Sequence, residues 1–115
     1  MGTNTGNYEV DAKDAALRVI REYFAGKGID IKEIIFFGSR SRGDHNEESD
    51  WDFLVIIGEE LEFKEKHRII TRIKRKLAKL RIPNDIIVQS KRRFDSMKDY
   101  PGSISYVANL EGITA

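Results

Sequence analysis

Residues 33–58 read EIIFFGSRSRGDHNEESDWDFLVIIG and decide the fold. Two short apolar runs, EIIFF at 33–37 and DFLVII at 52–57, flank a polar connection. Each run is rich in β-branched or aromatic residues and is closed by a glycine, Gly38 or Gly58, which is typical of a strand buried on both faces. The stretch therefore predicts a strand, a polar loop and a second strand.

The segments on either side predict helices and a third strand. Apolar residues recur at helical spacing from Asp11 until Gly26 and Gly28 stop the pattern. Downstream, a helix is predicted over 63–80 and a third strand over 85–89. The first prediction rests on the apolar residues Ala12, Ala15, Ala16, Val19, Tyr23 and Phe24. The second rests on Phe63, Ile70, Ile73, Leu77 and Leu80, and Pro83 ends this helix.

The C-terminal tail predicts two more helices. The first is short and follows Arg92, the chain breaks at Pro101 and Gly102, and the last helix ends near Gly112. At 115 residues the chain has the size of one domain, which we place at residues 9–115 after a flexible segment at 1–8.

Composition narrows the functional classes. The 20 Lys and Arg residues balance 19 Asp and Glu residues, so net charge gives no reason to expect nucleic-acid or membrane binding. The absence of cysteine excludes disulfides and thiolate metal sites and fits a reducing compartment. No apolar run approaches the roughly 20 residues of a membrane span, and the opening MGTNTGNYEV lacks the apolar stretch of a secretory signal. We expect a cytoplasmic protein.

Three acidic residues stand where strands begin. Asp50 and Asp52 are two residues apart at the start of the second strand, so both carboxylates are expected on one side of the sheet. Asp85 opens the third strand and would join them if that strand lies beside the second. Unpaired carboxylates held together are costly unless a cation relieves their repulsion, and oxygen ligands suit Mg²⁺. These three acids are the predicted metal ligands.

The turn after the first strand carries candidates for phosphate binding. Gly38 and Ser39 are small enough for backbone N–H groups to approach a phosphate, and Gly43 relaxes the same turn. Arg40 and Arg42 lie within it, and a guanidinium group suits phosphate oxygens. Surface ion pairs with the neighbouring acids are an equal alternative for both arginines.

The order GSRSRG, five residues, then SDWD, with an acid on the next strand, resembles the signature of the DNA polymerase β-like nucleotidyltransferase superfamily. The short chain is similar to its minimal nucleotidyltransferase (MNT) group, whose members are often paired with a HEPN-domain toxin. The match covers roughly residues 12–90, and Glu111–Gly112 near the C-terminus is also similar to these proteins. One departure is Trp51 between the acids, which we expect to point away from the metals into the core.

The resemblance implies the α/β (α+β) class, with a small mixed sheet packed against helices on one side. It implies that Asp50 and Asp52 bind two Mg²⁺ ions, with Mn²⁺ as an alternative, and that Asp85 activates the attacking hydroxyl. It also implies that Gly38 and Ser39 hold the triphosphate. The remaining nucleotide-binding candidates in the signature are Arg40, Arg42, Gly43 and Ser49.

The predicted activity is transfer of a nucleotide, AMP from ATP, to an acceptor hydroxyl outside this chain. The resemblance suggests a tyrosine of a HEPN toxin as the acceptor, which makes the protein an antitoxin. One alternative is a binding module that neutralises the toxin by covering it, with little or no catalysis. A weaker alternative is an RNA-binding or RNA-modifying protein that uses the basic run Lys74, Arg75, Lys76, Lys79 and Arg81.

Overall fold

A computed structural model describes the backbone of residues 5–115 and the side chains of residues 11–115. The predicted strands and the helices after them are confirmed, whereas the short helix α2 and the short strand β4 were not predicted. The elements are, in order, α1 Thr5–Gly26, β1 Ile31–Phe37, α2 Ser39–Arg42, β2 Trp51–Ile57, α3 Phe63–Lys79, β3 Asn84–Ser90, α4 Lys91–Met97, α5 Ile104–Glu111 and β4 Ile113–Thr114.

The first helix begins earlier than predicted. It starts at Thr5 rather than Asp11, so the part of the predicted flexible segment that the structure describes is helical. Residues 1–4 of that segment lie outside the described residues. The sequence prediction began at Asp11 because it relied on apolar residues at helical spacing, and residues 5–10 show no such spacing.

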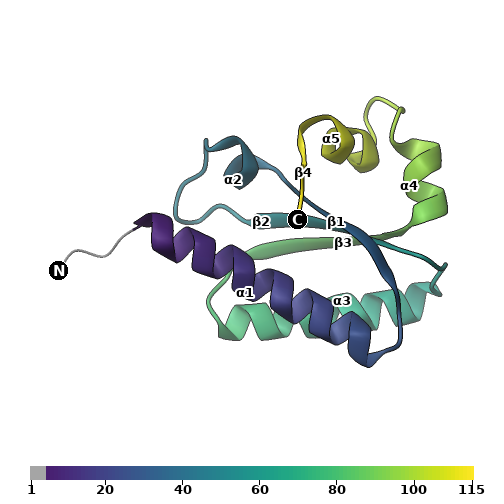
Figure 1. Ribbon diagram of the computed structural model, residues 1–115, viewed down its shortest axis with the longest axis horizontal. Coiled ribbons are helices and arrows are strands. Elements are labelled where there is room, and N and C mark those ends of the chain that lie inside the picture. Colours follow the sequence, from purple (N-terminus) through teal and green to yellow (C-terminus); the bar gives the residue numbers. More distant parts are fainter. Residues whose placement is uncertain (1–4) are drawn as a thin grey trace.

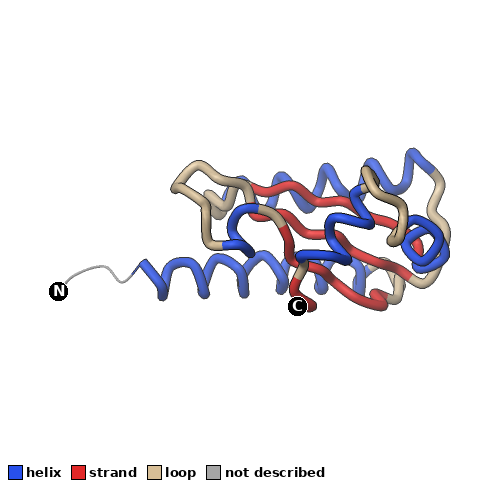
Figure 2. The backbone as a smooth tube through the Cα atoms, turned by 90° about the horizontal axis from the view of Figure 1, so that it is seen from above, coloured by secondary structure: helices blue, strands red, loops and turns tan. Residues whose placement is uncertain are grey.

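The described strands form a mixed sheet with the order β3-β2-β1-β4. β1 and β2 are antiparallel, whereas β2 and β3 are parallel, which confirms the predicted mixed sheet. Figure 2 shows these three strands side by side. The parallel pairing is made possible by α3, which returns the chain to the end of the sheet where β2 began.

Helices cover both faces of the sheet. α1 and α3 lie on one face, below the sheet in Figure 1, and α4 and α5 lie on the other. The predicted α/β class is confirmed, but the expectation of helices on one side only is corrected. The physical reason is that β1 and β2 are apolar on both faces, so each face needs a cover to exclude water.

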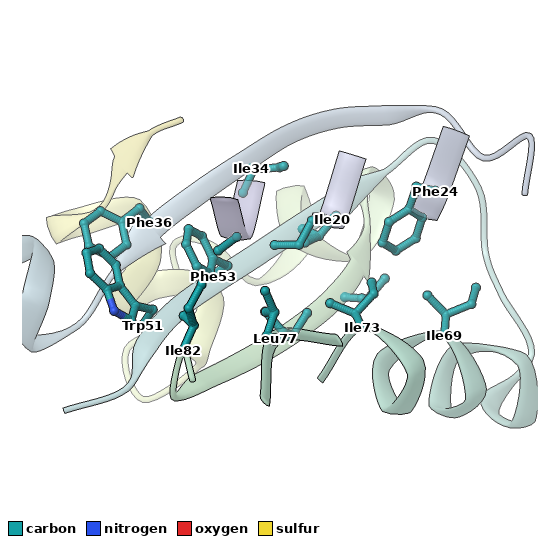
Figure 3. Packing of buried hydrophobic residues seen from close by; sticks show 14 of the residues in the cluster. Ile20, Phe24, Ile34, Phe36, Trp51, Phe53, Ile69, Ile73, Leu77 and Ile82 are labelled. Carbon is teal, nitrogen blue, oxygen red and sulfur yellow. The ribbon is translucent and has the colours of Figure 1, made fainter. Parts of the chain in front are cut away.

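The larger core lies between the sheet, α1 and α3 (Figure 3). α1 contributes a buried residue at every fourth position, and α3 contributes Ile69, Ile73 and Leu77. Of the stripe predicted for α3, Phe63 and Leu80 are instead 78% and 52% exposed. The buried residues of α1 are Ala12, Ala16, Ile20 and Phe24.

The smaller core lies on the opposite face, where α4 and α5 cover the sheet. Phe94 of α4 and Ala108 of α5 pack against Leu54 and Ile56 of β2. Side chains alternate along a strand, so Asp52 belongs to this same face. The smaller core therefore ends, at the start of β2, in a carboxylate.

Candidate active site

Asp52 and Asp85 are neighbours across two parallel strands. Each is the second residue of its strand, and the two are paired in register between β2 and β3. Residues paired in this way project to the same face. The Trp51 N–H donates to the Pro83 carbonyl at 2.9 Å, which fixes the start of both strands. The predicted convergence of these two acids is thus present in the fold.

Burial distinguishes the carboxylates. Asp52 is half-buried, whereas Asp50 and Asp85 are exposed. Burial, followed by the charges of Asp85 and Asp50, raises the pKa of Asp52 to about 6, and the nearby Arg42 acts in the opposite direction. A raised carboxyl pKa means that the ionised side chain is held at a cost, which a cation at this place would remove.

Gly38 is a glycine because Asp52 leaves no room for a side chain. A Cβ built on Gly38 would overlap the Asp52 carboxylate, and the residue has φ of 84°. β1 therefore delivers its backbone directly against the acid. Ser39 begins α2 next to it, and Gly43 ends α2 in the left-handed conformation at φ of 85°.

Arg40 holds the loop that carries Asp50. Its Nε donates to the Ser49 carbonyl at 3.0 Å, and its Nη2 reaches the carbonyls of Asn46 and Glu47, each at 3.3 Å. The guanidinium also lies over the Trp51 ring, 4.6 Å from its centroid. The residue was predicted to bind nucleotide, but this geometry supports a positioning role for Arg40.

Ser49, the other loop residue predicted to contact nucleotide, also holds the loop. Its hydroxyl accepts from the Asn46 N–H at 2.9 Å. Because Arg40 is bound to the Ser49 carbonyl, both residues fix the backbone immediately before Asp50. The loop holds Asp50 near enough for its charge to contribute to the raised pKa of Asp52.

Trp51 lies between the two acids and points away from them, as predicted. It is 3% exposed and stacks on Phe36, with ring centroids 5.4 Å apart, in the larger core. Figure 3 shows this pair at one end of the packed residues. This aromatic packing fixes the start of β2, where Asp52 is the next residue.

Arg42 and Glu111 complete the site. Arg42 forms ion pairs with Asp44 at 3.1 Å and with Glu111 at 2.9 Å. The same Glu111 oxygen accepts from the Gly38 N–H at 3.4 Å. Glu111 received no role from the sequence, although the Glu111–Gly112 pair was noted, because it lies at the far end of the chain. Only the tertiary fold brings it to the loop after β1.

The chemistry of the donors fits Mg²⁺. In the part of the chain that the structure describes, no three carboxylate or imidazole groups converge closely enough to form a metal site by themselves. Mg²⁺ usually takes one or two protein carboxylates and fills its remaining positions with water and substrate phosphates. Asp52 with one neighbouring acid supplies that number, and the crowding at Asp52 is the kind that a cation relieves.

Other surface features lie elsewhere. A hollow of about 450 Å³ runs along the outer side of α3, lined by Phe63, His67, Arg72 and neighbouring residues. α3 packs on the face opposite to Asp52, so this hollow is remote from the carboxylates. No helix among the described residues is long and apolar enough to cross a membrane.

Comparison with known proteins agrees with this site. The family model of the nucleotidyltransferase domain matches residues 17–103, which is more than half of the chain. The chain therefore belongs to the nucleotidyltransferase domain family. The matched range includes the loop after β1 and the acids at the starts of β2 and β3.

A relative at the level of individual proteins comes from Methanocaldococcus jannaschii and is named "Putative protein adenylyltransferase MJ0141". It is 48% identical over 40 residues, which are 35% of this chain and 40% of the relative. The chain thus spans less than half of the relative's length.

Proposed function

We propose that this protein transfers AMP from ATP to a hydroxyl group of a partner protein. The hydroxyl oxygen attacks the α-phosphate, the bond between the α and β phosphates breaks, and pyrophosphate leaves. The observation that carries the proposal is the register pair Asp52 and Asp85, of which Asp52 lies directly against Gly38. This arrangement puts carboxylates for a cation and open backbone for a triphosphate at one place. The name of the Methanocaldococcus jannaschii relative supports AMP as the transferred group and a protein as the acceptor.

Asp52, together with Asp50 or Asp85, is proposed to supply the one or two protein carboxylates that Mg²⁺ usually takes. The bound cation supplies charge neutralisation for the phosphate oxygens during transfer. The role of the protein is to hold these acids in place before the substrate binds. The packing of Trp51 on Phe36 fixes the start of β2, where Asp52 lies. The hydrogen bond from Arg40 to the Ser49 carbonyl fixes the loop immediately before Asp50.

Asp85 is the proposed residue that accepts the proton of the attacking hydroxyl. It is exposed at the start of an edge strand, so a hydroxyl of another molecule can approach it. Asp52, its neighbour in register, is half-buried and faces the loop after β1 instead. In this proposal Asp85 faces the acceptor and Asp52 faces the nucleotide.

The loop after β1 is the proposed triphosphate site. Gly38 allows close approach of backbone, and Arg42 places a positive charge on the same side as Asp52. The Ser39 hydroxyl is a further donor at this place. Such transfer depends chiefly on positioning and on charge neutralisation, which these residues supply without forming a covalent bond.

We propose a tyrosine of a HEPN-domain protein as the acceptor, so that the modification silences a toxin. The exposed position of Asp85 supports an acceptor carried by another chain. The alternative is a binding module that covers the toxin without modifying it. The two differ in whether label is transferred, because both predict a complex.

The test mixes the protein with α-labelled ATP, MgCl₂ and the product of the neighbouring gene, followed by mass spectrometry of the labelled peptide. We expect AMP on a tyrosine of the partner, and none when EDTA replaces MgCl₂. Asp95→Asn is the matched control for the site variants Asp52→Asn and Asp85→Asn and should still transfer AMP. Asp95 pairs with Lys91 on the exposed side of α4, so its loss leaves the site intact. A stable complex that carries no label under any condition would establish the binding module instead.

A further inference from the structure

We infer that Glu111 occupies the place of a substrate phosphate, so that nucleotide binding must displace this side chain. The inference rests on the proposed function, since it concerns the same loop. It adds that the protein carries its own anionic competitor at the end of α5. Glu111 would then set the affinity for the triphosphate without taking part in the chemistry.

The contacts of Glu111 are those expected of a phosphate oxygen. One carboxylate oxygen lies 2.9 Å from Nη1 of Arg42 and 3.4 Å from the backbone nitrogen of Gly38. A guanidinium group and a backbone N–H at a glycine turn are the donors that proteins use for phosphate. The carboxylate therefore satisfies both of the donors that a phosphate oxygen would use.

The fold holds Glu111 at this place from both sides. On one side it is the last residue of α5, and the following Gly112 N–H donates to the Ala108 carbonyl at 2.8 Å. On the other side β4 pairs with β1, where Phe36 is the partner of Ile113. Because β1 also leads directly into Gly38, the acid and the loop are anchored on the same strand.

Gly112 shows how closely this segment is packed. A Cβ at Gly112 would overlap the side chain of Ile35 and the carbonyl of Ala108. The turn from α5 into β4 is thus pressed against β1, which leaves Glu111 little freedom to move as a whole. Its side chain remains partly accessible at 27%, so it can rotate away when a phosphate arrives.

Removal of the Glu111 charge should tighten triphosphate binding. An ion pair with this exposure changes Kd by roughly fivefold at most. We therefore expect Glu111→Gln to lower the Kd for inorganic triphosphate with MgCl₂ about fivefold. Asp44→Asn is the matched control, because Asp44 is the other acid on Arg42. It should change the Kd less than twofold, since Asp44 pairs with Arg42 and does not accept from the Gly38 N–H.

The experiment measures calorimetric Kd values for inorganic triphosphate and follows the amide cross-peak of Gly38 by NMR. We expect the cross-peak to shift on titration of the wild type, towards its position in Glu111→Gln. An unchanged or weaker affinity in Glu111→Gln, or equal tightening in both variants, would overturn the inference. The proposed function can fail separately, if triphosphate displaces Glu111 but no AMP is transferred. It survives alone if AMP is transferred while Glu111→Gln binds triphosphate like the wild type.

Discussion

The two faces of the sheet differ in how they end, although one strand builds both. Trp51, Phe53 and Val55 of β2 point into the larger core under α1 and α3. Asp52 and Leu54, between them, face α4 and α5. The first face is apolar along the whole strand. The second is apolar at Leu54 and charged at Asp52, its neighbour on that face.

The difference shows how a small domain holds costly charges. The larger core fixes β2 by packing, while the acids lie where the smaller core stops and water begins. Burying each large apolar side chain contributes about 1.5–3 kcal/mol, so the larger core can tolerate some repulsion at Asp52. The face that carries Asp52 thus depends on the larger core for its geometry. Variants of the charged face should therefore affect transfer, and variants of the apolar face should affect stability.

The largest expected effect is on transfer and comes from the charged face. Asp52→Asn and Asp85→Asn should each lower the rate of AMP transfer about 10³-fold or more, because electrostatic groups of this kind dominate such reactions. Far-ultraviolet circular dichroism should stay unchanged. Transfer by either variant within tenfold of the wild type would contradict the roles assigned to this pair.

The next effect is on stability and comes from the apolar face. Phe53→Ala should lower the free energy of unfolding by about 3–5 kcal/mol, because Phe53 is 0% exposed and its loss leaves a cavity. Leu110→Ala on α5 is the control and should change stability by less than about 0.5 kcal/mol, since Leu110 is 72% exposed. Urea unfolding curves measure both. Equal effects would mean that the larger core does not hold the sheet.

A smaller effect concerns Arg40, which links the faces through Trp51 and the loop. Arg40→Lys should reduce transfer about tenfold, because an ammonium group cannot replace the planar guanidinium on several carbonyls. Arg92→Lys on exposed α4 is the control. If Arg40 acts through Asp50, it should cause no further loss in an Asp50→Asn background, and additive losses in the double variant would rule this out.

Much of this arrangement could be predicted from residues 33–58. Glycine-bounded apolar runs identified β1 and β2, and the spacing of Asp50 and Asp52 indicated acids at the start of a strand. The approach of Asp85 required β3 to lie beside β2, which the pairing confirms. These features were predictable because they depend on strand periodicity, which is a local property.

The remaining features depend on contacts between distant parts of the chain. Glu111 approaches Gly38 only through α5 and β4, and no local pattern marks it. The role of Arg40 depends on which way its side chain turns, and an arginine in a glycine loop is equally compatible with phosphate and with carbonyls. The exposure of Phe63 is set by the rotation of α3, which is fixed by Ile69, Ile73 and Leu77.

The smallest expected effect is also the most direct test of the link between charge and function. Ionised Asp52 is disfavoured in the folded state, since its pKa is raised there, and stability is lost as the pH rises through about 6. At neutral pH without ligands, Asp52→Asn should therefore be more stable than the wild type by about 1 kcal/mol, after allowance for solvent screening.

We propose that Asp52, which lowers the stability of the folded protein, serves to bind a metal and a nucleotide. The decisive measurement is the thermal unfolding midpoint of the wild type and of Asp52→Asn, with and without MgCl₂ and an ATP analogue that resists cleavage between the α and β phosphates. Ligand at about 100 times its Kd stabilises a protein by about 2.7 kcal/mol, which exceeds the cost of the acid. We predict that Asp52→Asn has the higher midpoint without ligands and the wild type the higher midpoint with them. An unchanged order of the two midpoints would contradict the account.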